Sequence, residues 1–317
     1  MKTTDQQTKL KRQKKVMIKE IWNDLLISDQ INKIFIITGP TSGLGKETLR
    51  ILSRKNATVI MAARDIKKAE AVKNEMLSHN KNGMIDIQEL DLSNLASINN
   101  FSKEIKKKYK VIDVLINNAG IMACPYSKTK DGFEIQMGTN HLGHFALTGL
   151  LLPLLQEQPN SRIVNVSSIA HKSGNINFDD LNWAKRKYKT WSAYSDSKLA
   201  NLYFTYELSH KLSLKNDNLK VLAAHPGYSD TDLQRYSGFF KVLNKIAAQS
   251  PTIGALAGIR AAVDPNAKSG DYYGSPSFGE IKGHPVLVTS NKLSHNKANA
   301  EALWSLSEEL TGVSYNV

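Results

Sequence analysis

The sequence predicts a doubly wound α/β fold, in which helices cover both faces of one parallel sheet. Two observations lead to it. From Lys33 onward, short β-branched apolar runs alternate with longer stretches of helical spacing, and this alternation implies crossover connections between parallel strands. A glycine-rich turn also follows the first run at Gly39, where this architecture binds its ligand. The 317 residues suit one large domain of this class or two small ones.

Six apolar runs have the length and composition of buried strands. The first (IFIIT) is β-branched and ends in glycine-rich sequence, the second (TVIMAA) is continuously apolar, and the third alternates apolar and polar residues. The predicted strands are residues 34–38, 58–63, 84–92, 111–116, 162–166 and 219–224.

Helical spacing fills the gaps between these runs. In the first gap, Leu49 and Leu52 share one face of a predicted helix. The helices predicted in this way are residues 46–55, 66–78, 95–108 and 136–156. After the fifth strand, a further helix is predicted by apolar positions at Leu199, Leu202, Tyr203, Tyr206 and Leu208.

Composition excludes several classes of protein. With 41% hydrophobic and 22% charged residues, the chain has enough apolar material for a sizeable core and is not wholly disordered. Cys124 is the one cysteine, which excludes an intrachain disulfide and a multi-cysteine metal site. No run reaches the roughly 18–20 apolar residues of a membrane helix, and the N-terminus lacks the apolar part of a secretory signal. A cytoplasmic protein without a transmembrane anchor is therefore expected.

Part of the net charge of +13 lies at the N-terminus, where residues 1–20 contain seven Lys or Arg and two acids. This composition predicts a mobile basic extension, placed at residues 1–30, ahead of a single domain at 31–317. An arm for nucleic acid or for an anionic membrane surface is the alternative interpretation. A solvated tail is favoured, so no nucleic-acid partner is expected.

The glycine turn indicates a dinucleotide site. Gly39, Gly43 and Gly45 permit a tight turn and a close backbone approach to a diphosphate, and the helix that follows offers free N–H groups. An ordinary strand-to-helix turn is the alternative. At the end of the second strand, where NAD enzymes usually place an acid for the ribose hydroxyl, the chain has Arg64. A guanidinium suits a 2′-phosphate, which favours NADP(H) over NAD(H) unless Asp65 turns inward.

Tyr194 and Lys198 have the spacing of an acid–base pair. On a helix, positions i and i+4 share a face, and a neighbouring ammonium is expected to lower the pKa of the phenol from about 10 toward neutrality. Such a tyrosine can pass a proton to or from an alcohol while hydride moves to or from a nicotinamide. A second pair with this spacing, Tyr126 and Lys130, lies in a polar stretch. The amphipathic pattern around Tyr194 therefore favours Tyr194.

Other polar residues follow predicted strands at the edge where this architecture binds ligand. They are Ser167 and Ser168 after the fifth strand, Asn117 to Gly120 after the fourth, and His225 to Gly227 after the sixth. Asn140 lies on the long helix between the fourth and fifth strands. His141, His144 and His225 have no metal-ligand spacing, so no metal site is expected.

Together the motifs TGPTSGLG, LDLSN, NNAG, TNHLGHF, NVSS, YSDSK and HPG resemble the short-chain dehydrogenase/reductase superfamily, from about Lys33 to the C-terminus. DGFEIQMGTNHLGHFALTGLLLPLL and AYSDSKLAN are most similar to its retinol-dehydrogenase-like and protochlorophyllide-reductase-like branch. The resemblance implies a Rossmann-type sheet with a C-terminal substrate lid. It also implies a small-molecule carbonyl or alcohol substrate, or, as in protochlorophyllide reductases, a double bond to be reduced.

The resemblance implies a role for each matching residue. Tyr194 would be the acid/base, Lys198 would lower its pKa and hold the nicotinamide ribose, Ser168 rather than Ser167 would bond the substrate oxygen, and Asn140 would hold a water linked to Lys198. Residues implied to contact the diphosphate are Gly39, Ser42, Gly43, Leu44 and Gly45. Those implied for the rest of the cofactor are Asp91 and Leu92 (adenine), Asn118, Ala119 and Gly120 (ribose), and Pro226, Gly227 and Thr231 (nicotinamide).

Two aromatic-rich stretches are expected to choose the substrate. Residues 228–283 follow the sixth strand, where the superfamily has its lid, and residues 171–190 form an insertion whose Trp183, together with the following Trp191, would supply one rim. The aromatics of the first stretch are Tyr236, Phe239, Phe240, Tyr272, Tyr273 and Phe278. An apolar pocket for a lipophilic substrate is the hypothesis, and ordinary core and loop aromatics are the alternative. A non-catalytic NADP(H)-binding regulator is the alternative function, and the set of Asn140, Ser168, Tyr194 and Lys198 argues against it, because a regulator does not need a phenol beside a lysine. A homo-oligomer is compatible with the sequence.

Overall fold

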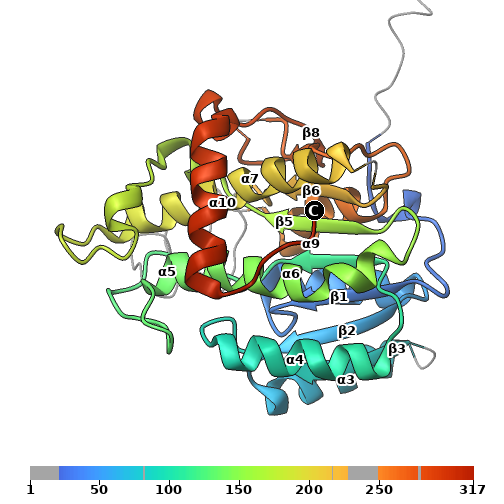
Figure 1. Cartoon of the computed structure of the whole chain (residues 1–317). Coiled ribbons are helices and arrows are strands. Elements are labelled where there is room, and N and C mark those ends of the chain that lie inside the picture. Colours follow the sequence, from blue (N-terminus) through green and yellow to red (C-terminus); the bar gives the residue numbers. More distant parts are fainter. Residues whose placement is uncertain (1–20, 81–82, 216, 228–248, 278–279) are drawn as a thin grey trace, which may run out of the picture.

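The computed structural model describes residues 21–80, 83–215, 217–227, 249–277 and 280–317 (Figure 1). Its centre is one sheet in the order β3-β2-β1-β4-β5-β6-β7-β8, parallel from β3 to β7, with β8 antiparallel to β7. This is the doubly wound α/β fold that the sequence predicts. The strands are β1 (Ile34–Thr38), β2 (Thr58–Ala63), β3 (Met84–Glu89), β4 (Val114–Asn117), β5 (Arg162–Val166), β6 (Lys220–Ala224), β7 (Tyr272–Gly274) and β8 (Val286–Leu287).

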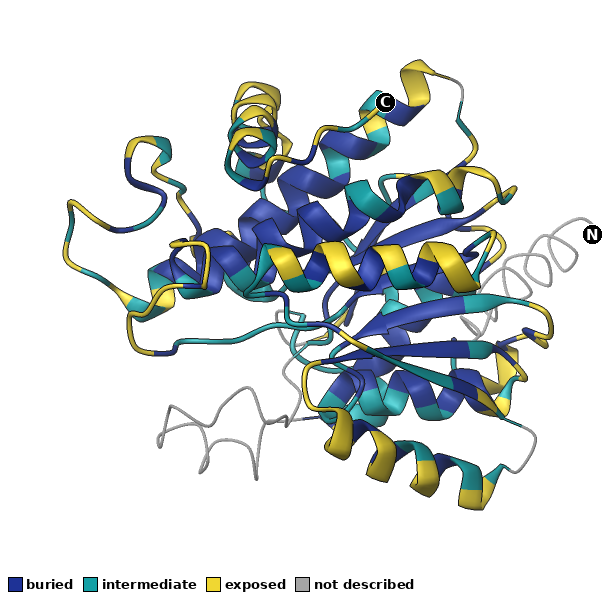
Figure 2. Ribbon diagram, turned by 60° about the horizontal axis from the view of Figure 1, so that its bottom comes forward, coloured by how far each residue is buried: buried dark blue, intermediate teal, exposed yellow. Residues whose placement is uncertain are grey.

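Helices cover both faces of the sheet. Apolar side chains of α2 (Gly43–Arg54), α3 (Ile66–His79) and α9 (Pro251–Val263) share one core with the first face. Those of α4 (Leu95–Lys108), α6 (Gly143–Gln156), α7 (Thr190–Leu214) and α10 (Lys297–Thr311) share a second core with the other face. All strands except β3 and β8, which lie at the two edges of the sheet, are buried along most of their length, and the outer sides of the helices are exposed (Figure 2). The short helices are α5 (Ile135–Met137), η1 (Asp24–Leu26), η3 (Ile169–Ser173), η4 (Phe178–Asp180) and η6 (Lys292–His295).

The helix predicted over residues 136–156 is interrupted. Between α5 and α6 the chain makes one π-helical turn, η2 (Gly138–Leu142). π-turns are rare and are found mostly at functional sites. This one contains Asn140.

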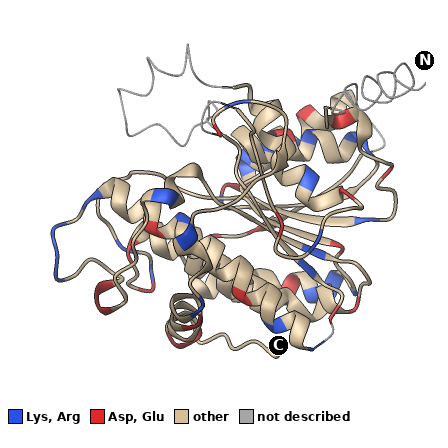
Figure 3. Cartoon of the chain, turned by 90° about the horizontal axis from the view of Figure 1, so that it is seen from above, with Lys and Arg blue, Asp and Glu red and all other residues tan. Residues whose placement is uncertain are grey.

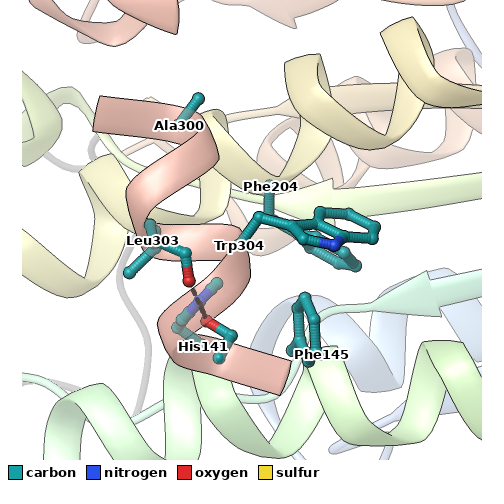
Figure 4. A pocket seen from close by; sticks show the side chains of 7 residues that line it. His141, Phe145, Phe204, Ala300, Leu303 and Trp304 are labelled. Atoms are coloured by element: carbon teal, nitrogen blue, oxygen red, sulfur yellow. Dashed lines mark hydrogen bonds between the residues drawn. The ribbon is translucent and has the colours of Figure 1, made fainter. Parts of the chain in front are cut away.

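An aromatic cluster packs α10 against α6 and α7. The rings of Phe145, Phe204, Trp304 and Tyr315 lie 4.6–6.2 Å apart between centroids, and Figure 4 shows the first three of them. The pocket at this cluster is too small for a water molecule, so it is packed core and not a ligand site. Next to it, His141 Nε2 lies 2.9 Å from Ser307 Oγ, which ties α10 to the turn that contains Asn140.

Residues 21–30, which the sequence analysis assigns to a mobile extension, pack against the domain. Trp22 and Ile27 are buried in the first core, the Arg260 guanidinium lies 5.6 Å from the Trp22 ring, and His284 Nδ1 is 3.1 Å from the Trp22 carbonyl oxygen. The prediction therefore does not hold for these ten residues, because apolar side chains among them reach the core. Residues 1–20 lie outside the described part of the chain.

Candidate active site

Helix α7 presents Tyr194 and Lys198 one turn apart, as their spacing predicts. Both side chains are buried, and the Lys198 ammonium lies 5.8 Å from the centre of the Tyr194 ring. Lys198 Nζ donates a 3.0 Å hydrogen bond to the carbonyl oxygen of Val166, at the end of β5. The alternative pair, Tyr126 and Lys130, is not on a helix.

The two serines after β5 have different surroundings. Ser167 is buried and donates its hydroxyl to the backbone carbonyl of Lys198 at 2.8 Å. Ser168 is extended, begins η3, and its hydroxyl forms a hydrogen bond that lowers the pKa of Tyr194. Ser168 is thus the serine that meets the phenol, while Ser167 fastens α7 to the sheet.

Asn140 lies between the loop that follows β4 and helix α7. Its amide oxygen accepts from Ile121 N at 2.8 Å, and its amide nitrogen donates to Ile121 O and to Ser197 Oγ, both at 2.9 Å. A Cβ added to Gly120 would lie 3.2 Å from Asn140 Oδ1 and 3.5 Å from Lys198 Nζ. Gly120, Asn140 and Lys198 therefore come together although they are far apart in the sequence.

Thr38, at the end of β1, joins the glycine turn to the loop after β4. Its hydroxyl oxygen accepts from Asn118 N and Ala119 N, both at 2.9 Å, and lies 2.9 Å from His144 Nε2. His144 Nδ1 faces the carbonyl oxygen of Asn140 at 3.0 Å and must donate, so Nε2 accepts from Thr38. Burial lowers the pKa of His144 to about 4, which keeps this ring neutral.

Burial dominates the titration of the tyrosine and the lysine. It raises the pKa of Tyr194 to about 12, with the Ser168 hydroxyl opposing the shift. It lowers the pKa of Lys198 from 10.5 to about 8. The expected lowering of the Tyr194 pKa toward neutrality is therefore not found in this structure, because desolvation of the phenolate outweighs its neighbours. At neutral pH the phenol is protonated and the lysine carries its charge.

We expect Lys198→Met to stabilise the protein at pH 7. Burial of the ammonium, with its pKa near 8 instead of 10.5, costs about 3 kcal/mol, whereas the lost bond to Val166 O is worth about 1–2 kcal/mol. A rise in melting temperature of a few degrees is expected, on the order of 2–4 °C. Since the folded-state pKa is below the unfolded one, the penalty is complete below pH 8 and disappears as pH rises toward 10.5. The difference from wild type should accordingly shrink in scans at rising pH, and a constant or growing difference would contradict this account.

The glycine turn fits a dinucleotide diphosphate. Gly39 and Gly43 have φ of +65° and +50°, and a Cβ on Gly45 would collide with the Gly39 carbonyl oxygen. Ser42 makes no capping hydrogen bond, and the first turn of α2, which contains Leu44, has no acidic residue. Uncapped N–H groups at a helix start attract an anion, so the backbone here suits a phosphate group.

Arg64 and Asp65 lie beside this turn, because Gly39 N donates to the Ala62 carbonyl at the end of β2. Arg64 is exposed. Asp65 is the N-cap of α3, and its carboxylate accepts from Lys68 N at 2.9 Å. The acid is thus engaged in capping and leaves the guanidinium as the charged group for a cofactor.

The residues predicted to contact the adenine and the nicotinamide are partly described. Asp91 Oδ1 accepts from Ser93 N at 3.0 Å and from Ser93 Oγ at 2.6 Å, and Leu92 is buried. Pro226 and Gly227 follow β6, with Gly227 at φ +66°. Thr231 lies outside the described residues.

The aromatic stretches divide between core and site. Tyr272 and Tyr273 belong to β7 and are buried in two different hydrophobic clusters, as core residues are. Trp183 is also buried, with the Arg186 guanidinium 3.5 Å from its ring centre. Trp191, in contrast, is 41% exposed, and its ring lies 6.1 Å from that of Tyr194. Tyr236, Phe239, Phe240 and Phe278 lie outside the described residues.

The described residues contain no group of three or more His, Cys, Asp or Glu able to hold a metal ion. None of the helices that the structure describes is both long and apolar enough to cross a membrane. Lys and Arg are distributed over several helices and loops with Asp and Glu among them (Figure 3).

Sequence reasoning missed three residues that shape the site: Thr38, Ser197 and Gln249. A polar residue ending a buried strand is a usable signal for Thr38. Ser197, inside the YSDSK motif, donates to the Tyr194 carbonyl at 2.7 Å, and the motif itself could have indicated it. Gln249 donates to the Pro226 carbonyl oxygen, and no sequence pattern marks it.

Comparison with known proteins agrees with this geometry. The family model for short chain dehydrogenase matches residues 33–238. Retinol dehydrogenase 12 of Mus musculus is 41% identical over 288 residues, covering 89% of this chain and 87% of that protein. Retinol dehydrogenase 13 of Homo sapiens is 47% identical over 206 residues, covering 65% of this chain but only 62% of that protein, less than two thirds of its length.

Solved structures agree as well. An uncharacterized protein from Mycobacterium paratuberculosis has 42% identity and a TM-score of 0.80, covering 93% of this chain and 99% of its own. The Pseudomonas aeruginosa RhlG/NADP active-site complex, at 22% identity and a TM-score of 0.61, covers 76% of this chain and 94% of its own, and supports the fold alone. The chain therefore belongs to the short-chain dehydrogenase family of nicotinamide-dependent oxidoreductases, in its retinol-dehydrogenase-like branch.

Proposed function

We propose that the protein is an NADP(H)-dependent oxidoreductase that transfers hydride between nicotinamide and a carbonyl/alcohol pair on a lipophilic substrate. One observation carries the proposal. A buried, protonated phenol at Tyr194, a hydroxyl at Ser168 and an ammonium at Lys198 converge at the same sheet edge as the glycine turn. This is the set of groups that a carbonyl reduction needs beside a hydride donor.

Each residue then has one task. The nicotinamide supplies the hydride when it is bound. The Ser168 hydroxyl hydrogen-bonds the substrate oxygen, and Tyr194 gives its proton to that oxygen as the carbonyl carbon becomes an alcohol carbon. The Lys198 ammonium stabilises the phenolate that is left. In the opposite direction the same phenolate accepts the proton of the alcohol.

Asn140 connects two parts of this site through its side-chain amide. The amide joins the loop at Ile121 to Ser197, within the turn of α7 between Tyr194 and Lys198. The family resemblance adds a water held beside Lys198, which would return a proton from solvent to Tyr194. The π-turn at η2 is the local distortion that gives Asn140 this position.

NADP(H) is proposed over NAD(H) because of the residues after β2. Arg64 is exposed there, and the Asp65 carboxylate faces the N–H of Lys68. A guanidinium forms strong bidentate bonds to a phosphate, whereas a capping carboxylate does not bind a ribose hydroxyl. Asp91, Leu92 and the backbone of Asn118 to Gly120 would complete the adenosine side, and Pro226, Gly227 and Thr231 the nicotinamide side.

A lipophilic substrate is proposed from Trp191 and from the relatives. An indole that is 41% exposed beside the catalytic phenol offers apolar surface to a substrate. The curated relatives at 41% and 47% identity are named as retinol dehydrogenases. A retinal-like aldehyde is accordingly the first substrate to test.

We expect Trp191→Ala to lower kcat/KM for retinal about tenfold or more. The substrate would lose the apolar surface of the indole on which it packs. Activity on a short aldehyde such as propanal should change little, because it does not reach the indole. Trp191→Phe, which keeps an aromatic surface, serves as the control. Equal losses on both aldehydes would contradict a role in substrate choice.

The proposal is tested by following NADPH absorbance with a panel of aldehydes and ketones of increasing length. Consumption of NADPH that yields the matching alcohol supports the proposal. Absence of turnover across the panel in both directions, with intact NADPH binding, would overturn the carbonyl/alcohol assignment.

A further inference from the structure

Glu280 joins two segments that flank the proposed site. It lies between Ser277 and Lys282, whose backbones form an antiparallel bridge. Its carboxylate oxygens meet different elements: Oε1 is 2.7 Å from Lys172 Nζ, and Oε2 is 3.2 Å from His225 Nε2. Lys172 belongs to η3, which begins directly after Ser168, and His225 directly precedes Pro226.

The backbone at Glu280 indicates that this position is held by its side chain. Its φ is +71°, in the left-handed region that a residue with a long side chain rarely adopts. Such conformations persist where surrounding contacts fix them, and they cluster near functional sites. The contact with His225, followed by the hydrogen bond from Lys172, lowers the pKa of Glu280 to about 2, so the carboxylate is charged at neutral pH.

His225 connects Glu280 to the turn at Pro226 and Gly227, which is proposed to hold the nicotinamide. Its Nδ1 accepts from Gly227 N at 3.2 Å, so in the neutral ring the proton is on Nε2, which faces Glu280. The ring is completely buried, packs 5.2 Å from Tyr272, and would collide with a Cβ at Gly274. Packing and the bond from Gly227 therefore keep Nε2 of the imidazole directed at Glu280.

The residues that follow Glu280 also contact the Pro226–Gly227 turn directly. A Cβ on Gly227 would collide with the carbonyl oxygen of Ile281. Gln249 donates to the Pro226 carbonyl oxygen and accepts from Gly283 N at 3.1 Å. The turn at Pro226 and Gly227 is thus in contact with Gln249 and with residues that directly follow Glu280.

We infer that Glu280 is a positioning residue. Through His225 and Lys172 it fixes the position of the Pro226–Gly227 turn relative to the segment after Ser168. The inference rests on the proposed function, because it assigns that turn to the nicotinamide and Ser168 to the substrate. In this role Glu280 acts through Lys172 and His225. Its effect is to keep the proposed nicotinamide turn and the proposed substrate serine at a constant distance from each other.

The test is Glu280→Gln in the full chain, with NADPH affinity measured by fluorescence titration. The glutamine has one carbonyl oxygen and can accept from Lys172 or His225 but not from both. We expect the Kd for NADPH to rise about tenfold, the cost of one hydrogen bond to a charged group. These contacts already exist in the cofactor-free protein, so its melting temperature should fall as well. A purely structural role would lower the melting temperature without raising the Kd for NADPH.

Matched variants make the result decisive. Glu207→Gln breaks a pair of similar burial, Glu207 Oε1 to Lys211 Nζ at 3.4 Å, and should leave the Kd unchanged. Lys172→Met removes one partner only and should raise the Kd about threefold, with no further rise when it is added to Glu280→Gln. If Glu280→Gln does not fold, Lys172→Met decides alone.

An unchanged Kd in Glu280→Gln, or in Lys172→Met where that variant decides, would overturn the positioning role. Failure of the wild-type protein to bind NADPH is a different outcome. It would overturn the proposed function, and the positioning role with it.

Discussion

Replacement of Tyr194 by phenylalanine should abolish turnover while leaving cofactor binding intact. The variant removes one hydroxyl from a buried ring and keeps its contact with Trp191, so the fold should be preserved. Without the phenol no group at this place can give a proton to the substrate oxygen. We expect kcat to fall by about 10³-fold or more, the upper range for loss of a general acid. The measurement is steady-state kinetics alongside an NADPH titration, in which the Kd should stay within about threefold of wild type.

Tyr126→Phe is the control, because it removes the hydroxyl of the other tyrosine that precedes a lysine by four positions. That hydroxyl lies 3.4 Å from the Asn182 carbonyl and outside the proposed machinery, so activity should be retained. Retention of turnover in Tyr194→Phe would refute the assigned acid/base. It would also revive the interpretation of the chain as an NADP(H)-binding regulator, for which a phenol beside a lysine is unnecessary.

Replacement of Arg64 by serine should remove the preference for the phosphorylated cofactor. A charge-assisted bidentate contact with the 2′-phosphate would be lost, so we expect the Kd for NADPH to rise about 100-fold. The Kd for NADH should change little, since NADH has no phosphate at this position. Binding titrations with both cofactors measure the change.

Arg54→Ser, which removes an exposed arginine from the last turn of α2, serves as the control and should affect neither cofactor. Arg64→Asp should go further than Arg64→Ser and improve NADH binding, since an acid here can accept from the ribose hydroxyl. Equal weakening of both cofactors by Arg64→Ser would show that the guanidinium serves the dinucleotide in general and not the 2′-phosphate.

The sequence predicts the strands best where the apolar run is β-branched and bounded by turn residues. β1, β2 and β5 begin and end at the predicted residues. Tyr272–Gly274 and Pro251–Val263 fall within the predicted lid region, residues 228–283, but they form β7 and α9 of the core. A strand of three residues has too little pattern to be recognised, and its aromatics resemble pocket residues until their burial is known.

The site shows the same division between local and tertiary information. The spacing of Tyr194 and Lys198 and the strand-end position of Ser168 are local, and the structure brings these residues together. The pKa of Tyr194 is not local, because it depends on burial that no neighbour in the sequence reveals. The contact of Glu280 with Lys172 and His225 joins segments far apart in the chain. No spacing could have indicated it.

The central claim, an NADP(H) site formed by the glycine turn and Arg64, is tested most directly by melting temperatures with NADPH and NADH at equal concentration. No substrate needs to be known. Ligand at 100 times its Kd adds about 2.7 kcal/mol of stability, which is readily visible as a shift. We expect a clear rise with NADPH and a much smaller one with NADH. A larger rise with NADH, or none with either cofactor, would contradict the account.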